Sequence, residues 1–270
     1  MDDKLSPMPS SPPMTPDVRE SLIERINNHA KLVFLLDYDG TLVPFALTPG
    51  KAFPDPELLD LLRVLTQRPN TAVHIVSGRD RQTLEQWFAG LSIGLHAEHG
   101  LWNRLDPRDD WRTEHPFPPP WKTCVLPLLE QFTRCTPGSL IEHKSASIAW
   151  HYRMAAPEFG AFQAKELHLH LAEVLSNFPV HVLSGDKVIE VKLRSVDKGQ
   201  VVSAFFSNLP DTLLVALGDD RTDEDLFAAL PENGVAIHVG ANSSRAPYRL
   251  DDYRAVRSLL RAILDKRPPR

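Results

Sequence analysis

Two aspartates separated by one residue follow a short apolar run near the start of the chain. The stretch reads KLVFLLDYDGTLVPF, in which apolar residues occupy 32–36 and the carboxylates are Asp37 and Asp39. Residues two apart in an extended chain point to the same side, so both carboxylates can reach one group. Such a pair could hydrolyse a phosphate ester in two steps, with Asp37 as nucleophile and Asp39 as general acid and then general base. For that role Asp39 must begin protonated.

Other residues able to do chemistry follow later apolar runs. Ser77 and Gly78 end the run TAVHIVSGR, Asp219 and Asp220 end TLLVALGDD, and Lys198 opens the helical stretch DKGQVVSAFFSNL. In an open parallel sheet, ligands bind at the carboxyl ends of the strands. Clustered carboxylates repel one another unless a cation lies between them. A few hard oxygen ligands, with room for water and a phosphate, suit Mg²⁺.

The elements that must position these residues alternate between strands and helices. In the first part of the chain, apolar periodicity predicts helices at 18–29, 55–67 and 80–90 and strands at 32–36 and 71–79. In the last part it predicts helices at 197–209, 223–230 and 254–265 and strands at 212–220 and 234–240. This alternation predicts an α/β core, a Rossmann-like parallel sheet with right-handed crossovers.

The middle of the chain has a different pattern. A proline-rich, charged stretch at 107–120 reads as a linker. After it we expect a helix at 121–134, strands at 139–144 and 147–153, a helix at 157–178, and a hairpin at 181–193 that turns at Gly185 and Asp186. We therefore expect a disordered leader at 1–16, the core at 17–112 and 194–270, and an inserted α+β cap of an antiparallel sheet and two helices at 113–193.

Each motif alone has a plainer interpretation. Asp39 and Gly40 could form a tight hairpin turn, the acids from Asp219 onward could favour a helix start, and Lys198 could be a solvated lysine. The order of the motifs along the chain favours a phosphate site: an acid pair, a Ser-Gly pair, a lysine that opens a helix, and a second acid pair.

DYDGTL, SGR, Lys198 and GDDRTDED resemble the four motifs of the haloacid dehalogenase superfamily of phosphatases. The stretches AEHG, EHKSASIAWHYR and KVIEVKL resemble the trehalose-6-phosphate phosphatase family within it. This resemblance runs from about Lys31 to the C-terminus. It implies Mg²⁺-dependent hydrolysis of trehalose 6-phosphate to trehalose and phosphate, through an aspartyl phosphate on the first aspartate.

The resemblance also implies roles for individual residues. Mg²⁺ would be held by the carboxylates of Asp37 and Asp219 and by the main-chain carbonyl of Asp39. Ser77, Gly78 and Lys198 would bind the phosphate. Asp220 and Asp223 would have supporting roles and orient water or the loop. Arg79 and His99 would bind substrate between the cap and the core.

Four charged residues of the expected cap are candidates for sugar binding: Glu142, Lys144, Arg153 and Glu190. By pattern alone they could equally form cross-strand salt bridges on a solvated sheet face. Carboxylates accept hydrogen bonds from sugar hydroxyls, whereas Lys and Arg donate to sugar oxygens. The family resemblance at these four positions favours the sugar-binding interpretation.

Composition limits the partners and the compartment. The net charge is −5 with no basic block, which argues against nucleic acid, and no apolar run is long enough to cross a membrane. The N-terminal stretch lacks a signal-peptide core, and two cysteines, Cys124 and Cys135, fit neither a disulfide framework nor a zinc site. We therefore expect a cytoplasmic enzyme, for which a trehalose-phosphate synthase is a candidate partner.

Three rival functions remain open from the sequence. The same chemistry could act on another sugar phosphate, such as glucosylglycerol phosphate or sucrose phosphate. A sensor could bind the sugar phosphate without turnover. A phospho-accepting receiver domain would also place an aspartate at a strand end, but it would lack the second acid and the inserted cap.

Overall fold

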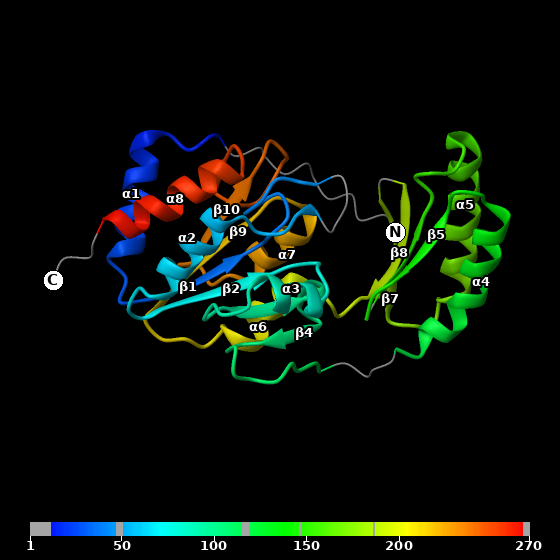
Figure 1. Ribbon diagram of the computed structural model, residues 1–270, viewed down its shortest axis with the longest axis horizontal. Coiled ribbons are helices and arrows are strands. Elements are labelled where there is room, and N and C mark those ends of the chain that lie inside the picture. The colour runs from blue at the N-terminus through cyan, green and yellow to red at the C-terminus, as the bar shows by residue number, and fades with distance from the viewer. Residues whose placement is uncertain (1–11, 47–50, 115–118, 146, 186, 267–270) are drawn as a thin grey trace. The chain divides into compact units, whose positions relative to one another are not determined.

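The computed structural model describes residues 12–46, 51–114, 119–145, 147–185 and 187–266. The chain forms two compact units. Unit 1 comprises residues 1–112 and 197–270, and unit 2 comprises residues 113–196. Figure 1 shows unit 1 as a layered arrangement of helices and a sheet, and unit 2 as a second sheet with two helices.

Unit 1 is built on a seven-stranded sheet in the order β11-β10-β9-β1-β2-β3-β4. All neighbouring strands are parallel except β3 and β4, which are antiparallel. The strands are β1 (Lys31–Leu36), β2 (Thr71–Val76), β3 (Gly94–Ala97), β4 (Trp102–Arg104), β9 (Thr212–Gly218), β10 (Val235–Val239) and β11 (Tyr248–Leu250). The predicted α/β core with a mostly parallel sheet is confirmed.

Helices cover this sheet on both faces, since its central strands are buried along nearly their whole length. The helices are α1 (Pro16–Asn27), α2 (Pro56–Thr66), α3 (Arg81–Trp87), α6 (Lys198–Phe205), α7 (Arg221–Ala229) and α8 (Tyr253–Asp265), with a 3-10 turn, η2 (Glu98–Gly100). Val33 and Leu35 of β1 share one apolar cluster with residues of α6 and α7. By the twofold alternation of a strand, Phe34 points to the opposite face.

Three strands of unit 1 were not predicted from the sequence: β3, β4 and β11. Each is only three or four residues long, and β4 and β11 lie at the two edges of the sheet. Short edge strands have too few residues to display an alternating pattern.

The last residues of the expected leader at 1–16 lie within the described structure. Residues 1–11 lie outside the described residues. Met14 already donates a main-chain hydrogen bond to Arg249 (3.1 Å), Thr15 caps α1 and Pro16 begins it. Of the proline-rich linker, residues 115–118 also lie outside the described residues, whereas Arg112 pairs with Asn103.

Unit 2 is the α+β insertion that the sequence predicts. Its antiparallel sheet has the order β5-β6-β8-β7. The elements are α4 (Trp121–Cys135), β5 (Leu140–His143), β6 (Ser147–His151), α5 (Pro157–Val174), β7 (Val180–Gly185) and β8 (Val188–Leu193). Of the predicted hairpin turn, Asp186 lies outside the described residues. Helix α5 ends at Val174, before the predicted Phe178. Pro179 disfavours a helical conformation at Phe178 itself.

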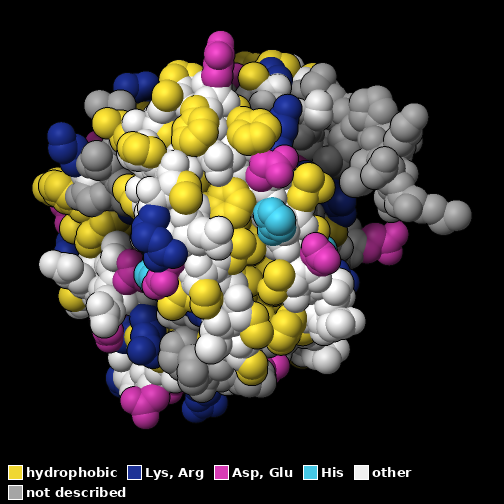
Figure 2. All heavy atoms as spheres, turned by 90° about the vertical axis from the view of Figure 1, so that its right-hand side faces the viewer, with side chains coloured by type: hydrophobic (Ala, Val, Ile, Leu, Met, Phe, Trp, Pro, Cys, Tyr) yellow, Lys and Arg dark blue, Asp and Glu magenta, His cyan; other side chains and the backbone are white. Residues whose placement is uncertain are grey.

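The inner face of the unit 2 sheet packs on its helices. Trp150 of β6 is fully buried, and its Nε1 donates to Thr133 Oγ1 of α4 at 3.1 Å. The outer surface over α4 and α5 carries many hydrophobic side chains (Figure 2), and Phe159, Phe162 and Leu169 of α5 are exposed. Across the described ranges, the helices lack the combined length and apolar character that crossing a membrane requires.

Candidate active site

The carboxyl ends of three neighbouring strands bring the first candidate residues together. β1 lies between β9 and β2. Asp37 directly follows β1, Ser77 follows β2 and Asp219 follows β9. The Asp37 main-chain N–H donates to Leu217 O of β9 at 2.9 Å, which continues the strand pairing to the edge of the site. The expected meeting of these residues at one edge of the sheet follows from the strand order.

Lys198 lies between two carboxylates in the interior of unit 1. Asp197 caps α6, so Lys198 is its first residue, and the side chain is 2% exposed. Its Nζ is 2.6 Å from Asp37 Oδ1 and 2.7 Å from Asp223 Oδ1. Burial alone would lower the pKa of Lys198, but the two carboxylates outweigh it and raise that pKa. Lys198 is therefore an ammonium inside the site and not a solvated lysine.

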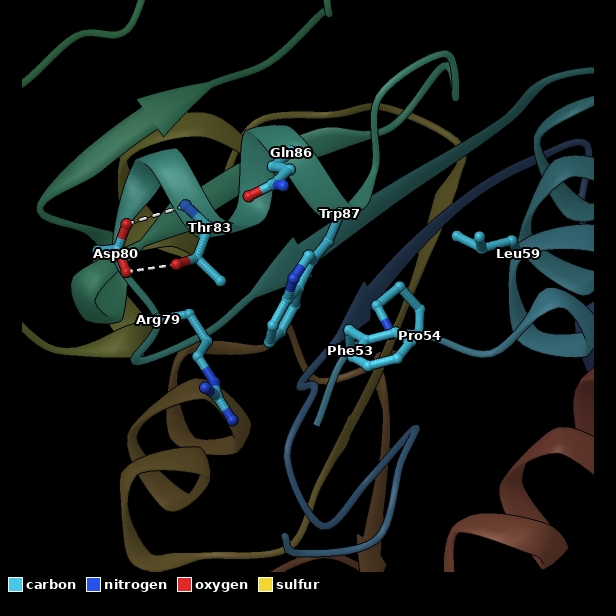
Figure 3. A pocket seen from close by; sticks show the side chains of 8 residues that line it. All are labelled: Phe53, Pro54, Leu59, Arg79, Asp80, Thr83, Gln86 and Trp87. Carbon is cyan, nitrogen blue, oxygen red and sulfur yellow. Dashed lines mark hydrogen bonds between the residues drawn. The ribbon is translucent and has the colours of Figure 1, made fainter. Parts of the chain in front are cut away.

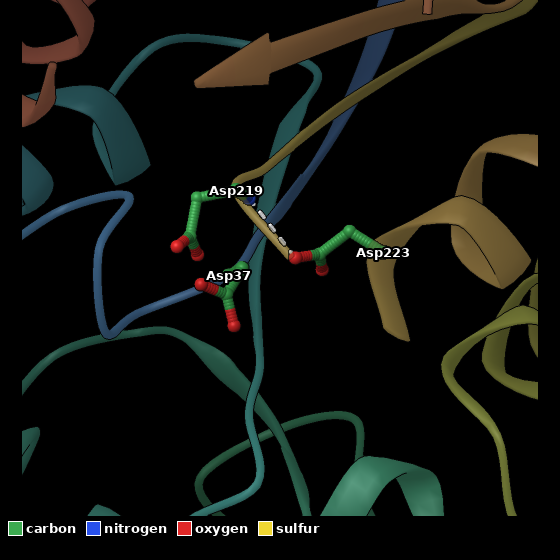
Figure 4. A group of neighbouring side chains, drawn as sticks. All are labelled: Asp37, Asp219 and Asp223. Carbon is green, nitrogen blue, oxygen red and sulfur yellow. Dashed lines mark hydrogen bonds between the residues drawn. The ribbon is translucent and has the colours of Figure 1, made fainter. Parts of the chain in front are cut away.

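Three carboxylates of unit 1 converge closely enough to hold one metal ion. One oxygen from each of Asp37, Asp219 and Asp223 lies within 4.8 Å of the others. Figure 4 shows these side chains directed toward one another, from the ends of two strands and from α7. Asp37 Oδ2 is buried and has no hydrogen-bond partner among the described residues. The arrangement can accept a cation.

The pKa values of this cluster reflect crowding of negative charge. Burial, offset only partly by Lys198, raises the pKa of Asp37 to about 7. Burial and the neighbouring Asp220 and Asp223 raise the pKa of Asp219 to about 7. Each shift means that the site resists holding all of its carboxylates ionised without further positive charge.

Asp223, which was predicted as a supporting residue, has both of its carboxylate oxygens engaged. It is fully buried, and its Oδ2 accepts the main-chain N–H groups of Asp219 (3.0 Å) and Asp220 (3.1 Å). It therefore orients the loop after β9 while its other oxygen pairs with Lys198. Asp220 caps α7 through Thr222 N (2.8 Å), which agrees with the plainer expectation of a helix start.

Thr41 belongs to the site and was not singled out from the sequence. Its Oγ1 donates to Asp219 Oδ1 at 3.3 Å, and its side chain is fully buried. The position of Thr41 within DYDGTL could have identified it as a site residue, since a hydroxyl four residues after the first aspartate can reach the neighbouring strand end. Gly40 is also required there, because a Cβ at Gly40 would lie 2.2 Å from Asp219 Oδ2.

Asp39 is held by Arg79 in a two-pronged ion pair. Arg79 Nε lies 2.7 Å from Asp39 Oδ2, and Nη2 lies 2.5 Å from Oδ1. The guanidinium also stacks over Trp87, 5.0 Å from the ring centre. The sequence placed Arg79 among the substrate contacts, but it did not predict this pairing with the second aspartate.

Beside this ion pair lies an open pocket of about 600 Å³. Figure 3 shows its lining, which comprises Phe53, Pro54, Leu59, Arg79, Asp80, Thr83, Gln86 and Trp87. Asp80 caps α3 through Thr83 N at 2.9 Å, and so fixes the helix that carries Gln86 and Trp87. The pocket offers an aromatic face, an amide and a guanidinium.

The loop after β2 lies against the AEHG stretch. A Cβ at Gly78 would lie 2.8 Å from His99 Nε2, so the His99 ring packs directly over Gly78. The main-chain N–H of His99 donates to Ser77 O, and that of Glu98 donates to Arg79 O, both at 2.9 Å. His99 therefore adjoins the Ser-Gly pair within unit 1.

Three of the four predicted sugar-binding residues of unit 2 share one face of its sheet. Glu142, Ala149 and Glu190 are paired across β5, β6 and β8, so the two glutamates lie on the same side. Glu190 Oε1 accepts from Ser147 Oγ (2.7 Å) and pairs with Lys144 Nζ (3.5 Å).

One contact of this face and the position of Arg153 were not predicted from the sequence. Glu142 Oε2 lies 2.7 Å from His151 Nε2. Arg153 does not lie on a strand, because β6 ends at His151 and residues 152–155 turn toward α5.

Comparisons with known proteins agree with this geometry. A family model described as trehalose-phosphatase matches residues 35–254. A bifunctional trehalose-6-phosphate synthase/phosphatase from Thermoproteus tenax is 40% identical over 238 residues, which cover 88% of this chain and 32% of the relative. The chain spans about a quarter to a third of the length of the curated relatives that it matches first.

Solved structures show the same fold. The C-terminal domain of trehalose-6-phosphate phosphatase from C. albicans superposes with a TM-score of 0.79 and 31% identity, covering 94% of this chain and 98% of that one. A haloacid dehalogenase-like hydrolase from Bacteroides thetaiotaomicron has a TM-score of 0.64 at 14% identity, covering 86% and 99%. The second likeness concerns the fold alone.

Proposed function

Because the chain belongs to the trehalose-phosphatase family, we propose that it hydrolyses trehalose 6-phosphate to trehalose and inorganic phosphate. The observation that carries the proposal is that Asp37 and Asp219, at neighbouring strand ends, have carboxylate oxygens within 4.8 Å of each other, and that Lys198 of α6 pairs with Asp37. Two negative groups, a carboxylate and a phosphate ester, can react there only where positive charge is supplied.

Asp37 is the nucleophile of the proposed reaction. Its Oδ1 is held by Lys198, whereas Oδ2 has no protein partner in the described part of the chain and is the oxygen available for attack on phosphorus. The attack forms a bond between phosphorus and the carboxylate oxygen and breaks the bond to the sugar oxygen. Water then hydrolyses the aspartyl phosphate and releases inorganic phosphate.

Asp39 acts first as a general acid that gives a proton to the leaving sugar oxygen, and then as a general base that takes a proton from the attacking water. The two-pronged pair with Arg79 constrains this role. Because Arg79 donates to both carboxylate oxygens of Asp39, neither oxygen can exchange a proton with a sugar oxygen until the guanidinium has moved away. A substrate oxygen that accepts from Arg79 would release the carboxyl.

The residues present fit a bound Mg²⁺. One carboxylate oxygen from each of Asp37, Asp219 and Asp223 lies within 4.8 Å of the others, and the raised pKa values of Asp37 and Asp219 reflect crowding that a cation would relieve. Asp37, Asp219 and the main-chain carbonyl of Asp39 would hold the ion, with Asp223 beside it. Bound there, Mg²⁺ would neutralise the carboxylates and polarise the phosphoryl oxygens.

The phosphate is held by Ser77, Gly78 and Lys198. A hydroxyl, a glycine main chain and an ammonium match the charge that spreads over the phosphoryl oxygens in the transition state. In unit 2, Glu142, Lys144 and Glu190, together with the exposed Arg153, would bind sugar hydroxyls. In unit 1, Arg79 and His99 are the proposed substrate contacts.

A trehalose-phosphate synthase is the proposed partner, since the relatives of this chain carry that name and are about three times as long. The cytoplasm is the proposed compartment. Both cysteines, Cys124 and Cys135, are free and exposed, which suits a reducing environment.

The test is phosphate release from trehalose 6-phosphate, with Mg²⁺ and with a chelator. We expect turnover with Mg²⁺ only. Asp37→Asn should lower turnover by at least about a thousandfold, and Asp39→Asn by about a hundredfold or more. Asp211→Asn is the matched control, because this exposed aspartate has a φ of 56°, which asparagine adopts readily.

The same assay separates the rivals. Faster release from sucrose phosphate or glucosylglycerol phosphate would overturn the assignment of trehalose 6-phosphate. Tight binding of trehalose 6-phosphate without any turnover would favour a sensor. Wild-type turnover by Asp39→Asn would refute the role of the second aspartate.

A further inference from the structure

A chain of buried hydrogen bonds in unit 1 leads from the interior of the sheet to the phosphate-binding loop. His74 of β2 and His96 of β3 are both buried, and His74 Nδ1 lies 3.1 Å from His96 Nε2. His96 Nδ1 lies 2.7 Å from Asn103 Oδ1, and Asn103 Nδ2 donates to Gly100 O at 2.7 Å. We call His74, His96 and Asn103 the His–Asn chain. The reaction proposed above uses none of these residues.

The donors and acceptors of this chain run in one direction. Gly100 O can only accept, so the Asn103 amide nitrogen faces it and the amide oxygen faces His96. That oxygen can only accept, so His96 Nδ1 carries a proton, and His96 Nε2 accepts from His74 Nδ1. Burial lowers the pKa of His96 to about 4 and that of His74 well below its usual range, which keeps both rings neutral. Every donor therefore points toward Gly100.

The turn that receives this chain is strained. Glu98, His99 and Gly100 have φ values of 49°, 60° and 94°, so three successive residues adopt the left-handed region and two of them carry side chains. Non-glycine residues in this region are strained and persist only where the surroundings hold them. The hydrogen bond to Gly100 O, given by Asn103, is one of the contacts that hold this turn.

The same turn contacts the Ser77–Gly78 loop on one side and residues on either side of Lys198 on the other. On one side it donates to Ser77 O and Arg79 O, and the His99 ring packs over Gly78. On the other side, a Cβ at Gly100 would lie 2.8 Å from Val201 Cγ2 and 3.5 Å from Asp197 O, at the start of the helix that carries Lys198. The turn therefore lies between the Ser-Gly loop and the N-terminus of α6.

We propose that the His–Asn chain is a positioning device for phosphate binding: by holding the 98–100 turn, it sets the distance between the Ser77–Gly78 loop and Lys198. The inference rests on the proposed phosphate site, but it does not require turnover. His74, His96 and Asn103 are positioning residues, because they act through the turn and touch no reacting atom.

The test compares asparagine substitutions at two buried sites of unit 1. Asn103→Leu removes both side-chain hydrogen bonds, whereas Asn103→Asp keeps the acceptor for His96 and loses the donor to Gly100 O. Asn27 is the matched control, since it is buried, accepts from Arg68 (2.6 Å) and donates to Lys266 O (2.9 Å) away from the phosphate loop. Asn27→Leu and Asn27→Asp therefore report the general cost of such changes.

Two quantities are measured on the Mg²⁺-loaded full chain, below the melting temperature of each variant: kcat/KM for trehalose 6-phosphate, and the Kd of inorganic phosphate by calorimetry. A displacement of about 1 Å in a binding group can cost a hundredfold. We expect both Asn103 variants to lose about tenfold or more in kcat/KM and to weaken phosphate binding by a similar factor. The Asn27 variants should change neither quantity by more than about twofold, even where they lower the melting temperature equally.

The outcomes separate this inference from the proposed function. Folded Asn103 variants with wild-type phosphate affinity would overturn the inference, as would equal losses in the Asn27 variants. Retention of phosphate binding by Asn103→Asp alone would show that the bond to Gly100 O is not what matters, and would also overturn it. A wild-type protein that binds phosphate but never releases it from a sugar would refute the proposed function. The comparison of phosphate Kd values between the Asn103 and Asn27 variants would still test the role of the His–Asn chain.

Discussion

Replacing Lys198 with methionine tests how the active site balances its buried charges. Lys198 Nζ lies 2.6 Å from Asp37 Oδ1 and 2.7 Å from Asp223 Oδ1, and both carboxylates are almost completely buried. Removal of one partner from a buried ion pair costs about 3 to 5 kcal/mol, because the other charge stays buried without compensation. Methionine fills a similar volume, so this cost is mainly electrostatic.

The cost should depend on pH, because the two carboxylates can neutralise themselves by binding protons. Burial raises the pKa of Asp37 and Asp223 even with Lys198 present, and without it both values should rise further. A folded-state pKa above the unfolded value of about 3.9 means that the folded protein is favoured at low pH and loses stability as pH rises toward the folded pKa. Each group contributes about 1.4 kcal/mol per pH unit in that range.

The assay is urea unfolding in chelator at pH 5.5 and pH 8.5, with wild type, Lys198→Met and the double variant Lys198→Met/Asp223→Asn. We expect the deficit of Lys198→Met to be about 3 to 5 kcal/mol at pH 8.5 and at least about 1 kcal/mol smaller at pH 5.5. The double variant should recover part of the deficit at pH 8.5, since asparagine can still accept from Asp219 N and Asp220 N. It should not recover phosphatase activity, which needs the ammonium.

Lys266→Met is the control, because Lys266 pairs with Glu20 on the surface and its side chain is 44% exposed. This variant should unfold like the wild type at both pH values, since exposed ion pairs contribute little. If the deficit of Lys198→Met were the same at both pH values, or if the double variant were no more stable than the single one, the account of Lys198 as a buried counter-charge would be refuted.

Two further predictions concern the buried histidines. The folded pKa of His96, about 4, lies below the unfolded value of about 6.5, so the contribution of His96 to stability should fall by about 3 kcal/mol as pH drops from 7 to 4. In urea titrations over this range, the wild type should therefore lose about that much stability relative to His96→Asn, and an equal pH dependence of the two proteins would refute this. Gly94→Ala should destabilise unit 1 by about 1 to 3 kcal/mol, because its Cβ would lie 2.0 Å from His74 Nδ1. The double variant with His74→Ala should recover part of that loss in the same measurement, and no recovery would contradict the clash.

The central strands could be predicted from the sequence because burial on both faces gives them continuous apolar runs. Leu32–Leu36 shows this most clearly, with five apolar residues that are all buried in the middle of the sheet. The edge strand β11 reads only Tyr-Arg-Leu, and its pairing with β10 depends on the tertiary fold. The strand order itself, which places β1 between β9 and β2, follows from no local pattern.

The candidate site was predictable as far as chain direction determines it. Asp37, Ser77 and Asp219 each follow a buried parallel strand, and the carboxyl ends of such strands lie at one edge. The pairing of Arg79 with Asp39 could not be foreseen, because it depends on how the loop after β2 folds back across forty residues of sequence. The His–Asn chain was not predicted from the sequence for the same reason, because His74 and His96 are neighbours only through the pairing of β2 with β3.

The charges of the site explain why the substrate and a cation should bind together. Lys198 supplies one positive charge to the cluster of Asp37, Asp219 and Asp223 by pairing with Asp37 and Asp223, and Arg79 is already engaged by Asp39. With its carboxylates ionised, this edge of the sheet carries excess negative charge and would repel a phosphate ester. With a divalent cation among them, the same groups become nearly neutral, and the phosphate brings the remaining negative charge next to Lys198. Occupancy of the cation site should therefore tighten phosphate binding, and the reciprocal must hold, because coupling between two ligands is symmetric.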